Sequence, residues 1–149
     1  MLIRDVKIII ASKIKGTRPM PDDIDLSFNV YEALQYVATM TTPRVLLRNS
    51  QKDIQDSTFR VIEECSYITI PDRPVFDVSD KDYSDIKHLN IDEDLVFAVI
   101  YYALHVMLKG NEPTQLGGEK KTSKQMCDDL IAIYQSNFSR AGAEIHDVL

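Results

Sequence analysis

Leu95–Leu108 reads LVFAVIYYALHVML, and His105 is the only conventionally polar residue in the run. A helix that is apolar nearly all round has to be buried on most of its sides. The run has 14 residues, whereas roughly 20 are needed to span a bilayer. The stretch therefore predicts the central helix of a small domain, or half of a packed subunit assembly, and no membrane partner.

The residues on both sides of the run mark the ends of this helix. Asn90 is a suitable cap for the free N–H groups of a first turn, and Glu93 follows it in capping-box position. Acidic residues suit the positive end of a helix dipole, while Lys109 and Gly110 suit the other end. We expect one helix over 91–109, capped by Asn90.

Apolar residues at helical spacing predict three more helices, over 1–15, 26–41 and 122–140. Asp22, Asp23 or Asp25 should cap the second helix. Gly16 should end the first helix and Ala141-Gly142 the last. In the last helix the spacing places five residues on one face: Met126, Leu130, Ile133, Tyr134 and Phe138. The last two helices should form an antiparallel hairpin that packs together Leu95, Val99, Tyr102, Val106, Leu130 and Tyr134.

The insert at about 57–76 carries strand signals in two short runs, FRVI and YITI, before the proline pair in PDRP. We expect a β-hairpin or paired extended segments here, and a helix through Ile54–Cys65 is the competing interpretation. A short helix over Pro43–Arg48 and a short tail over 143–149 complete one domain, 1–149. The expected fold class is mainly α (α+β): a small helical domain with a central apolar helix, a C-terminal helical hairpin and a short β-hairpin.

Composition argues against a disordered chain and against a protein that binds nucleic acid through its phosphates. The chain has 149 residues, 44% of them hydrophobic and 27% charged, as in a folded globular domain. Its net charge of −6 argues against a surface that neutralises phosphates. The charge is segregated, since residues 1–18 carry five bases against Asp5 alone, while Glu63–Asp94 carries ten acids against three bases. The two patches are either plain solvated surface or a guide for one subunit onto another.

No motif predicts catalysis, a cofactor or a metal. Asp77–Asp85 resembles a calcium loop, but with Asp80 in first position Asp85 replaces the required Gly, and Ile91 stands where the bidentate Glu belongs. Gly117-Gly118 is followed by Glu119, not by the Lys of a phosphate loop. We expect a chain that is not an enzyme.

The histidines and cysteines give no reactive pair either. His88, His105 and His146 form no HxxxH or HxH spacing, and His105 is expected to be an interior or interface residue. Cys65 and Cys127 are 62 residues apart, without CxxC spacing, and are expected to be reduced, half-buried thiols.

The order of elements over Ala33–Gly142 resembles that of adaptor, or head–tail connector, proteins of tailed bacteriophages. The resemblance rests on three stretches: YITIPDRP, NIDEDLVFAVIYYALHVMLKG and KQMCDDLIAIYQSNFSRAG. They correspond to a β-like insert that ends in a proline pair, an acid-capped apolar helix with paired aromatics, and a last helix after a Gly-rich loop. The short tail after Gly142 departs from family members whose long C-terminal extensions reach the portal, which leaves open which end makes the portal contact here.

The resemblance implies a non-enzymatic virion protein at the head–tail interface. About twelve copies would form a closed ring beneath the portal, extend the channel through which genomic DNA passes without sequence-specific binding, and hold the next tail or neck protein. The alternative is a soluble helical protein-interaction module or regulator of phage or bacterial origin.

Contacts with other subunits or partners are expected in three places. The ribbon Phe59–Ile70 contributes Tyr67, Ile68 and Ile70, because an isolated two-stranded hairpin is unstable in water. The central helix contributes Tyr101, because adjacent Tyr101 and Tyr102 cannot both enter one small core. The tail contributes three residues beyond the last predicted helix: Ile145, Val148 and Leu149.

Overall fold

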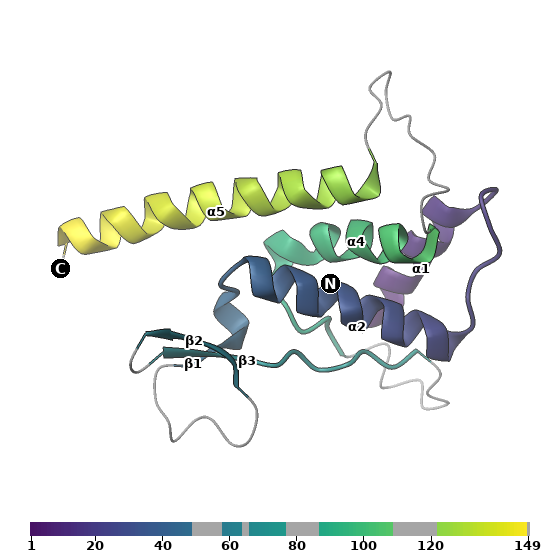
Figure 1. Ribbon diagram of the computed structural model, residues 1–149, viewed down its shortest axis with the longest axis horizontal. Coiled ribbons are helices and arrows are strands. Elements are labelled where there is room, and N and C mark those ends of the chain that lie inside the picture. Colours follow the sequence, from purple (N-terminus) through teal and green to yellow (C-terminus); the bar gives the residue numbers. More distant parts are fainter. Residues whose placement is uncertain (49–57, 64–65, 77–86, 109–121, 149) are drawn as a thin grey trace.

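A computed structural model describes residues 1–48, 58–63, 66–76, 87–108 and 122–148, and for 48, 58–63, 66, 67 and 138–148 the description is confined to the backbone. The segment Asp77–Asp85, the Gly-rich loop, Cys65 and Leu149 lie outside the described residues. The helices account for most of the described chain, and the sheet is small (Figure 1). The expected mainly helical fold class is confirmed.

Helix α4, Val96–Leu108, is the central element of the core. It contacts α5, α2 and α1, and in Figure 1 it lies between α5 and α2. Ala98, Val99 and Ala103 of this helix are fully buried, whereas Phe97 is 41% exposed. The run that is apolar nearly all round is therefore covered on most sides, as the sequence predicts, and one side remains open.

The start of this helix differs from the prediction. A 3-10 turn, η3, covers Glu93–Leu95 and leads into α4, with Asp92 in the N-cap position and no side-chain capping hydrogen bond. Asn90 is therefore not the cap, and Glu93 makes no capping box with it. The Asp92 carboxylate instead accepts hydrogen bonds from the backbone of a distant segment, a contact that helix-end statistics cannot reveal.

Helices α1, Ile3–Ile14, and α2, Asp23–Met40, agree with the predicted ranges within a few residues. Asp22 caps α2, since its side chain accepts a hydrogen bond from the backbone N–H of Asp25 at 2.8 Å. Gly16 follows α1 with φ of 85°, a left-handed conformation that a side chain disfavours. Lys7 of α1 pairs with Asp23 of α2 at 2.8 Å and joins the two helices at the surface.

The β element is a three-stranded antiparallel sheet in the order β1-β3-β2. Strand β1 is Leu47–Arg48, β2 is Thr58–Glu63 and β3 is Ser66–Thr69. The expected hairpin is confirmed in the pairing of β2 with β3, and the competing helix is excluded over 58–63. The short helix expected over Pro43–Arg48 is a single 3-10 turn, η1, over Arg44–Leu46, followed by β1.

Helix α5, Ser123–Val148, is longer than predicted. Gly142 does not end the helix, so the expected tail after it is helical as far as Val148. A glycine permits the left-handed conformation that ends a helix but does not require it. Helices α4 and α5 run in opposite directions, as predicted for a helical hairpin, and the C-terminal part of α5 extends past the other helices (Figure 1).

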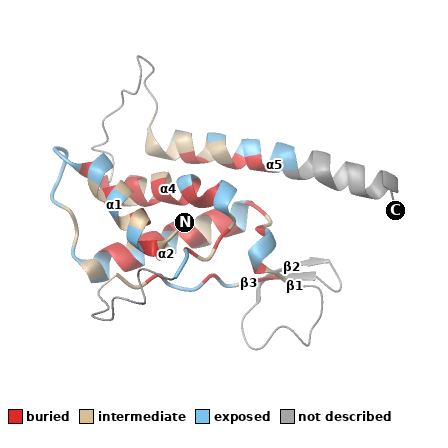
Figure 2. Cartoon of the chain, turned by 180° about the vertical axis from the view of Figure 1, so that it is seen from behind, coloured by how far each residue is buried: buried red, intermediate tan, exposed pale blue. Residues whose placement is uncertain are grey.

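The packed face of α5 is displaced by one residue from the predicted face. Cys127, Ile131 and Tyr134 are buried, while Ile133 is 57% exposed. Two residues of the predicted stripe, Met126 and Leu130, are only half-buried. The burial pattern in Figure 2 shows α5 red mainly on the side that meets α4.

The predicted core set is mostly brought together. Leu95, Val99 and Tyr134 are buried in the main core, and Tyr102 and Leu130 pack against it from half-buried positions. Val106 is half-buried and is not a residue of that core.

Candidate interaction surfaces

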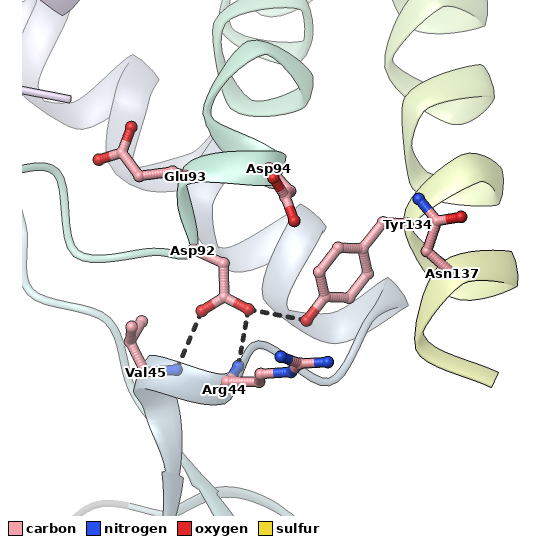
Figure 3. A pocket seen from close by; sticks show the side chains of 7 residues that line it. All are labelled: Arg44, Val45, Asp92, Glu93, Asp94, Tyr134 and Asn137. Carbon is pink, nitrogen blue, oxygen red and sulfur yellow. Dashed lines mark hydrogen bonds between the residues drawn. The ribbon is translucent and has the colours of Figure 1, made fainter. Parts of the chain in front are cut away.

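A cleft of about 310 Å³ lies where η3 and η1 meet α5 (Figure 3). Its lining includes three consecutive acids, Asp92, Glu93 and Asp94, opposite Arg44. Tyr134 projects from α5 with its hydroxyl toward Asp92 (Figure 3). This cleft is the polar site that the fold brings together most clearly.

The Asp92 carboxylate accepts three hydrogen bonds in this cleft. The backbone N–H groups of Arg44 and Val45 donate to it at 2.9 and 3.0 Å, and the Tyr134 hydroxyl donates at 2.7 Å. Asp92 thus satisfies the first free N–H groups of η1 and also holds α5. A carboxylate engaged by these three donors joins η3 to η1 and to α5.

Tyr134 is held in the same junction. Its hydroxyl also lies 3.2 Å from the carbonyl oxygen of Thr42, and Gln135 Nε2 donates to the carbonyl of Met40. Burial and then the hydrogen bond to Asp92 raise the pKa of Tyr134 far above its usual value. The phenol therefore stays protonated and continues to donate throughout the neutral range.

A second polar cluster joins α2, α4 and α5. The rings of Tyr36 and Tyr102 are stacked with centroids 4.0 Å apart. Asp128 Oδ1 accepts from the Tyr36 hydroxyl at 2.8 Å, and Asp128 Oδ2 accepts from Lys124 Nζ at 2.9 Å. Burial raises the pKa of Asp128, but the hydrogen bonds from Lys124 and Tyr36 outweigh it and lower that pKa overall. An ionised carboxylate with two donors again stabilises helix packing.

The residues next to this cluster have no reactive arrangement. Cys127 is fully buried, and burial raises the pKa of its thiol to about 12, so the thiol stays neutral and unreactive. His105 is half-buried, with its ring tilted against Tyr102 at 5.5 Å between centroids. The expected half-buried thiol is therefore a core residue at Cys127.

A third surface is apolar and lies between α4 and α5. Phe97 and Tyr101 of α4 line it on one side, and Met126, Asp129 and Leu130 of α5 on the other. This surface, here named the α4/α5 groove, has a volume of about 470 Å³. Sequence periodicity assigned Met126 and Leu130 to the core face of α5. The groove became visible only when α4 and α5 were packed together.

Of the expected contact residues on the ribbon, Ile68 is buried inside the chain. It packs against Ala38 and Leu46 in a small core of its own, at 0% exposure, and is therefore not a contact residue on the surface. The third strand and this small core also stabilise the hairpin from within the chain. Ile70 is 37% exposed, whereas the side chain of Tyr67 lies outside the description.

The other expected contact residues fall in two places. Tyr101 is half-buried at the groove, where its hydroxyl accepts from Lys13 Nζ at 3.3 Å. Ile145 and Val148 belong to the C-terminal turns of α5, for which only the backbone is described. The structure therefore brings Tyr101 close to Lys13, and it leaves the ribbon and the end of α5 as separate regions.

Within the described ranges, no group of three or more His, Cys, Asp or Glu side chains is arranged to hold a metal ion. None of the helices in the same part of the chain combines the length and apolar character that crossing a bilayer requires.

Comparison with known proteins assigns no family, since no family model, no curated protein and no solved structure matches the chain.

Proposed function

We propose that this chain is a structural virion protein of a tailed bacteriophage, which forms a ring beneath the portal and links head to tail. The observation that carries the proposal is the shape of the C-terminal hairpin. The N-terminal turns of α5 pack into a helical body, and the C-terminal turns of α5 extend past that body (Figure 1). A body with a projecting helix has the two parts that a ring subunit needs. The body fills one place in the ring, and the helix contacts a neighbouring subunit.

The charge of the chain supports the same function. Its net charge is −6, and Asp94 is exposed at the cleft beside η3. Cationic surfaces bind DNA by releasing counterions from its phosphates. An acidic wall avoids such binding, so DNA could slide through the channel without being held.

The proposed partners are other copies of the chain in a ring of about twelve, the portal protein on one side, and a tail or neck protein on the other. In this role the chain carries out no reaction and needs no cofactor. Its surfaces serve for contact, and the hydrogen-bonded clusters at Asp92 and Asp128 keep the body rigid while DNA passes.

Electron microscopy of particles from the source would test the proposal. A ring of this chain should appear between portal and tail, and labelling of the chain with a specific antibody should mark the neck of the particle. Absence of the chain from purified particles would overturn the proposal.

A second function is a helical interaction module or regulator that acts on one partner protein. The observation that favours it is the α4/α5 groove, whose apolar lining has the character of a site for a partner's side chains. Such a module would be found outside particles, as a monomer or dimer bound to a single partner.

A further inference from the structure

The α4/α5 groove is an apolar surface with charged residues at its edges. Phe97 is 41% exposed, and Ile133, one turn along α5 from Leu130, is 57% exposed. Lys13 lies at one edge, with Nζ 5.0 Å from the ring centroid of Tyr101, and Asp129 lies within the lining. A segment that fills the groove should therefore be apolar in the middle and carry a negative charge at the border near Lys13.

The C-terminal turns of α5 have this pattern. With about 100° between successive residues of a helix, positions 138, 141, 145 and 148 fall on one face. The residues there are Phe138, Ala141, Ile145 and Val148. Glu144 stands on one border of that face and supplies a charge opposite to that of Lys13.

The end of α5 cannot fill the groove of its own copy. Leu130 and Ile145 belong to one continuous helix, and 15 residues at 1.5 Å each separate them by about 22 Å along its axis. A straight helix cannot fold back on itself. Only the α5 of another copy can bring these residues to the groove.

We propose that residues 138–148 of one copy lie in the α4/α5 groove of the next copy. This inference deepens the proposed ring function and rests on it for its biological setting. The contact is heterologous, because the groove and the helix end are different surfaces of the chain. Heterologous contacts join copies head to tail, and they close into a ring when the rotation between neighbours permits.

Cross-linking of paired cysteines tests the contact in the full-length chain. Cys65 is replaced by Ser, and Cys127 is kept because it is fully buried and its thiol is neutral. Tyr101→Cys is then combined with Ile145→Cys. The matched control combines Tyr101→Cys with Ala143→Cys, since position 143 lies on the opposite face of the same helix. Met126→Cys serves as a second groove position and guards against a folding defect at Tyr101.

Under mild oxidation the Tyr101→Cys/Ile145→Cys chain should give a ladder of dimers, trimers and larger species, with at least about tenfold more product than the control. A mixture of the two single variants should give dimers that contain one of each and no larger species. The same results are expected with Met126→Cys in place of Tyr101→Cys.

Three results would overturn the inference: equal products in test and control pairs, dimers alone from the double variants, or a chain that stays monomeric up to about 1 mM. The proposed function has its own separate outcome. A ladder from a chain that is absent from particles leaves the contact standing and removes the connector function. If particles contain the ring but its 138–148 segments contact another protein, the connector function stands and the groove contact is rejected.

Discussion

The two halves of α5 teach what decides the role of a helix in this molecule. Residues 123–137 lie against α4 and bury Cys127, Ile131 and Tyr134, whereas the C-terminal turns extend beyond α4 (Figure 1). Both halves are helical, and both carry apolar residues at helical spacing. The difference arises from length, since α5 has 26 residues and its partner α4 has 13. Periodicity predicts a helix, but only a neighbouring element makes one face of it part of a core.

The largest expected effect is the difference in unfolding free energy between truncating a buried isoleucine and truncating an exposed one. Ile100→Ala in α4 removes a fully buried side chain and should lower the free energy of unfolding by about 2–5 kcal/mol. Ile133→Ala in α5 removes a side chain that is 57% exposed and should change it by less than about 0.5 kcal/mol. Urea denaturation of both variants measures the difference, and equal losses would contradict the assigned face of α5.

Tyr134→Phe should come next, because it removes the hydroxyl that donates to Asp92 at 2.7 Å. Hydrogen bonds to charged groups contribute about 1.5–3 kcal/mol, and a loss of that size is expected in chemical denaturation. Tyr101→Phe is the matched control, since its half-buried hydroxyl has only a 3.3 Å contact with Lys13 and its loss should cost less than about 0.5 kcal/mol. If Tyr134→Phe left the free energy of unfolding unchanged, the hydrogen bond to Asp92 would not hold α5 in place.

Cys127 offers a pH test of the packed half of α5. Burial raises the pKa of its thiol from 9.0 to about 12, so the folded state favours the neutral thiol. Stability from this group is fully present below pH 9 and is lost as pH rises toward 12, because the unfolded chain ionises first. At pH 10 the loss should be about 1.4 kcal/mol.

The measurement for Cys127 compares the slope of unfolding free energy against pH between the parent chain and Cys127→Ala. The variant should show a shallower decline above pH 9, whatever its stability at neutral pH. Parallel slopes would mean that the thiol is exposed to water and that α5 is not packed at this position.

The smallest effects concern two glycines that look alike in sequence. Gly16→Ala places a side chain at φ of 85° and should lower the free energy of unfolding by about 1 kcal/mol. Gly142→Ala replaces a glycine inside a helix and should favour that helix by about 0.5–1 kcal/mol. Because the end of α5 lies apart from the body, this gain should appear as amide exchange slowed about two- to fivefold over 143–148. Faster exchange in Gly142→Ala would show that α5 ends where the sequence suggested.

Much of the fold could be predicted from the sequence, and three of the errors have a common origin. The ranges of α1 and α2, the cap at Asp22 and the β2–β3 pairing follow from local spacing and capping chemistry. The wrong predictions are the Asn90 cap, the end of α5 at Ala141-Gly142, the contact role of Ile68, and the placement of Ile133 on the same face of α5 as Tyr134. The errors at Asn90, Ile68 and Ile133 depended on which segment lies opposite, and local patterns hold no such information. The end of α5 was wrong because a glycine permits the conformation that ends a helix but does not require it.

The candidate surfaces divide in the same way. Tyr101 could be chosen from sequence because two adjacent tyrosines on a helix diverge by about 100°, and the structure places it at the groove. The expectation that the two tyrosines cannot share one core is wrong, since Tyr101 and Tyr102 are both half-buried and both pack against the main core. Asp92 could not be recognised, since its donors Arg44, Val45 and Tyr134 are 42 to 48 residues away along the chain. The groove at Phe97 and Met126 was missed for the same reason, because its two walls come from different helices.

The sequence by itself determined the helices, the apolar character of α4 and the acidic charge, because backbone hydrogen bonding, capping and hydrophobic burial act over a few residues at a time. The tertiary structure alone decided which sides of those helices stay exposed. It set α5 against a helix half its length, directed Asp92 to the N-terminus of η1, and left the α4/α5 groove open. These outcomes depend on packing between distant segments, where the shape and length of the neighbour select among faces that the sequence makes almost equally apolar.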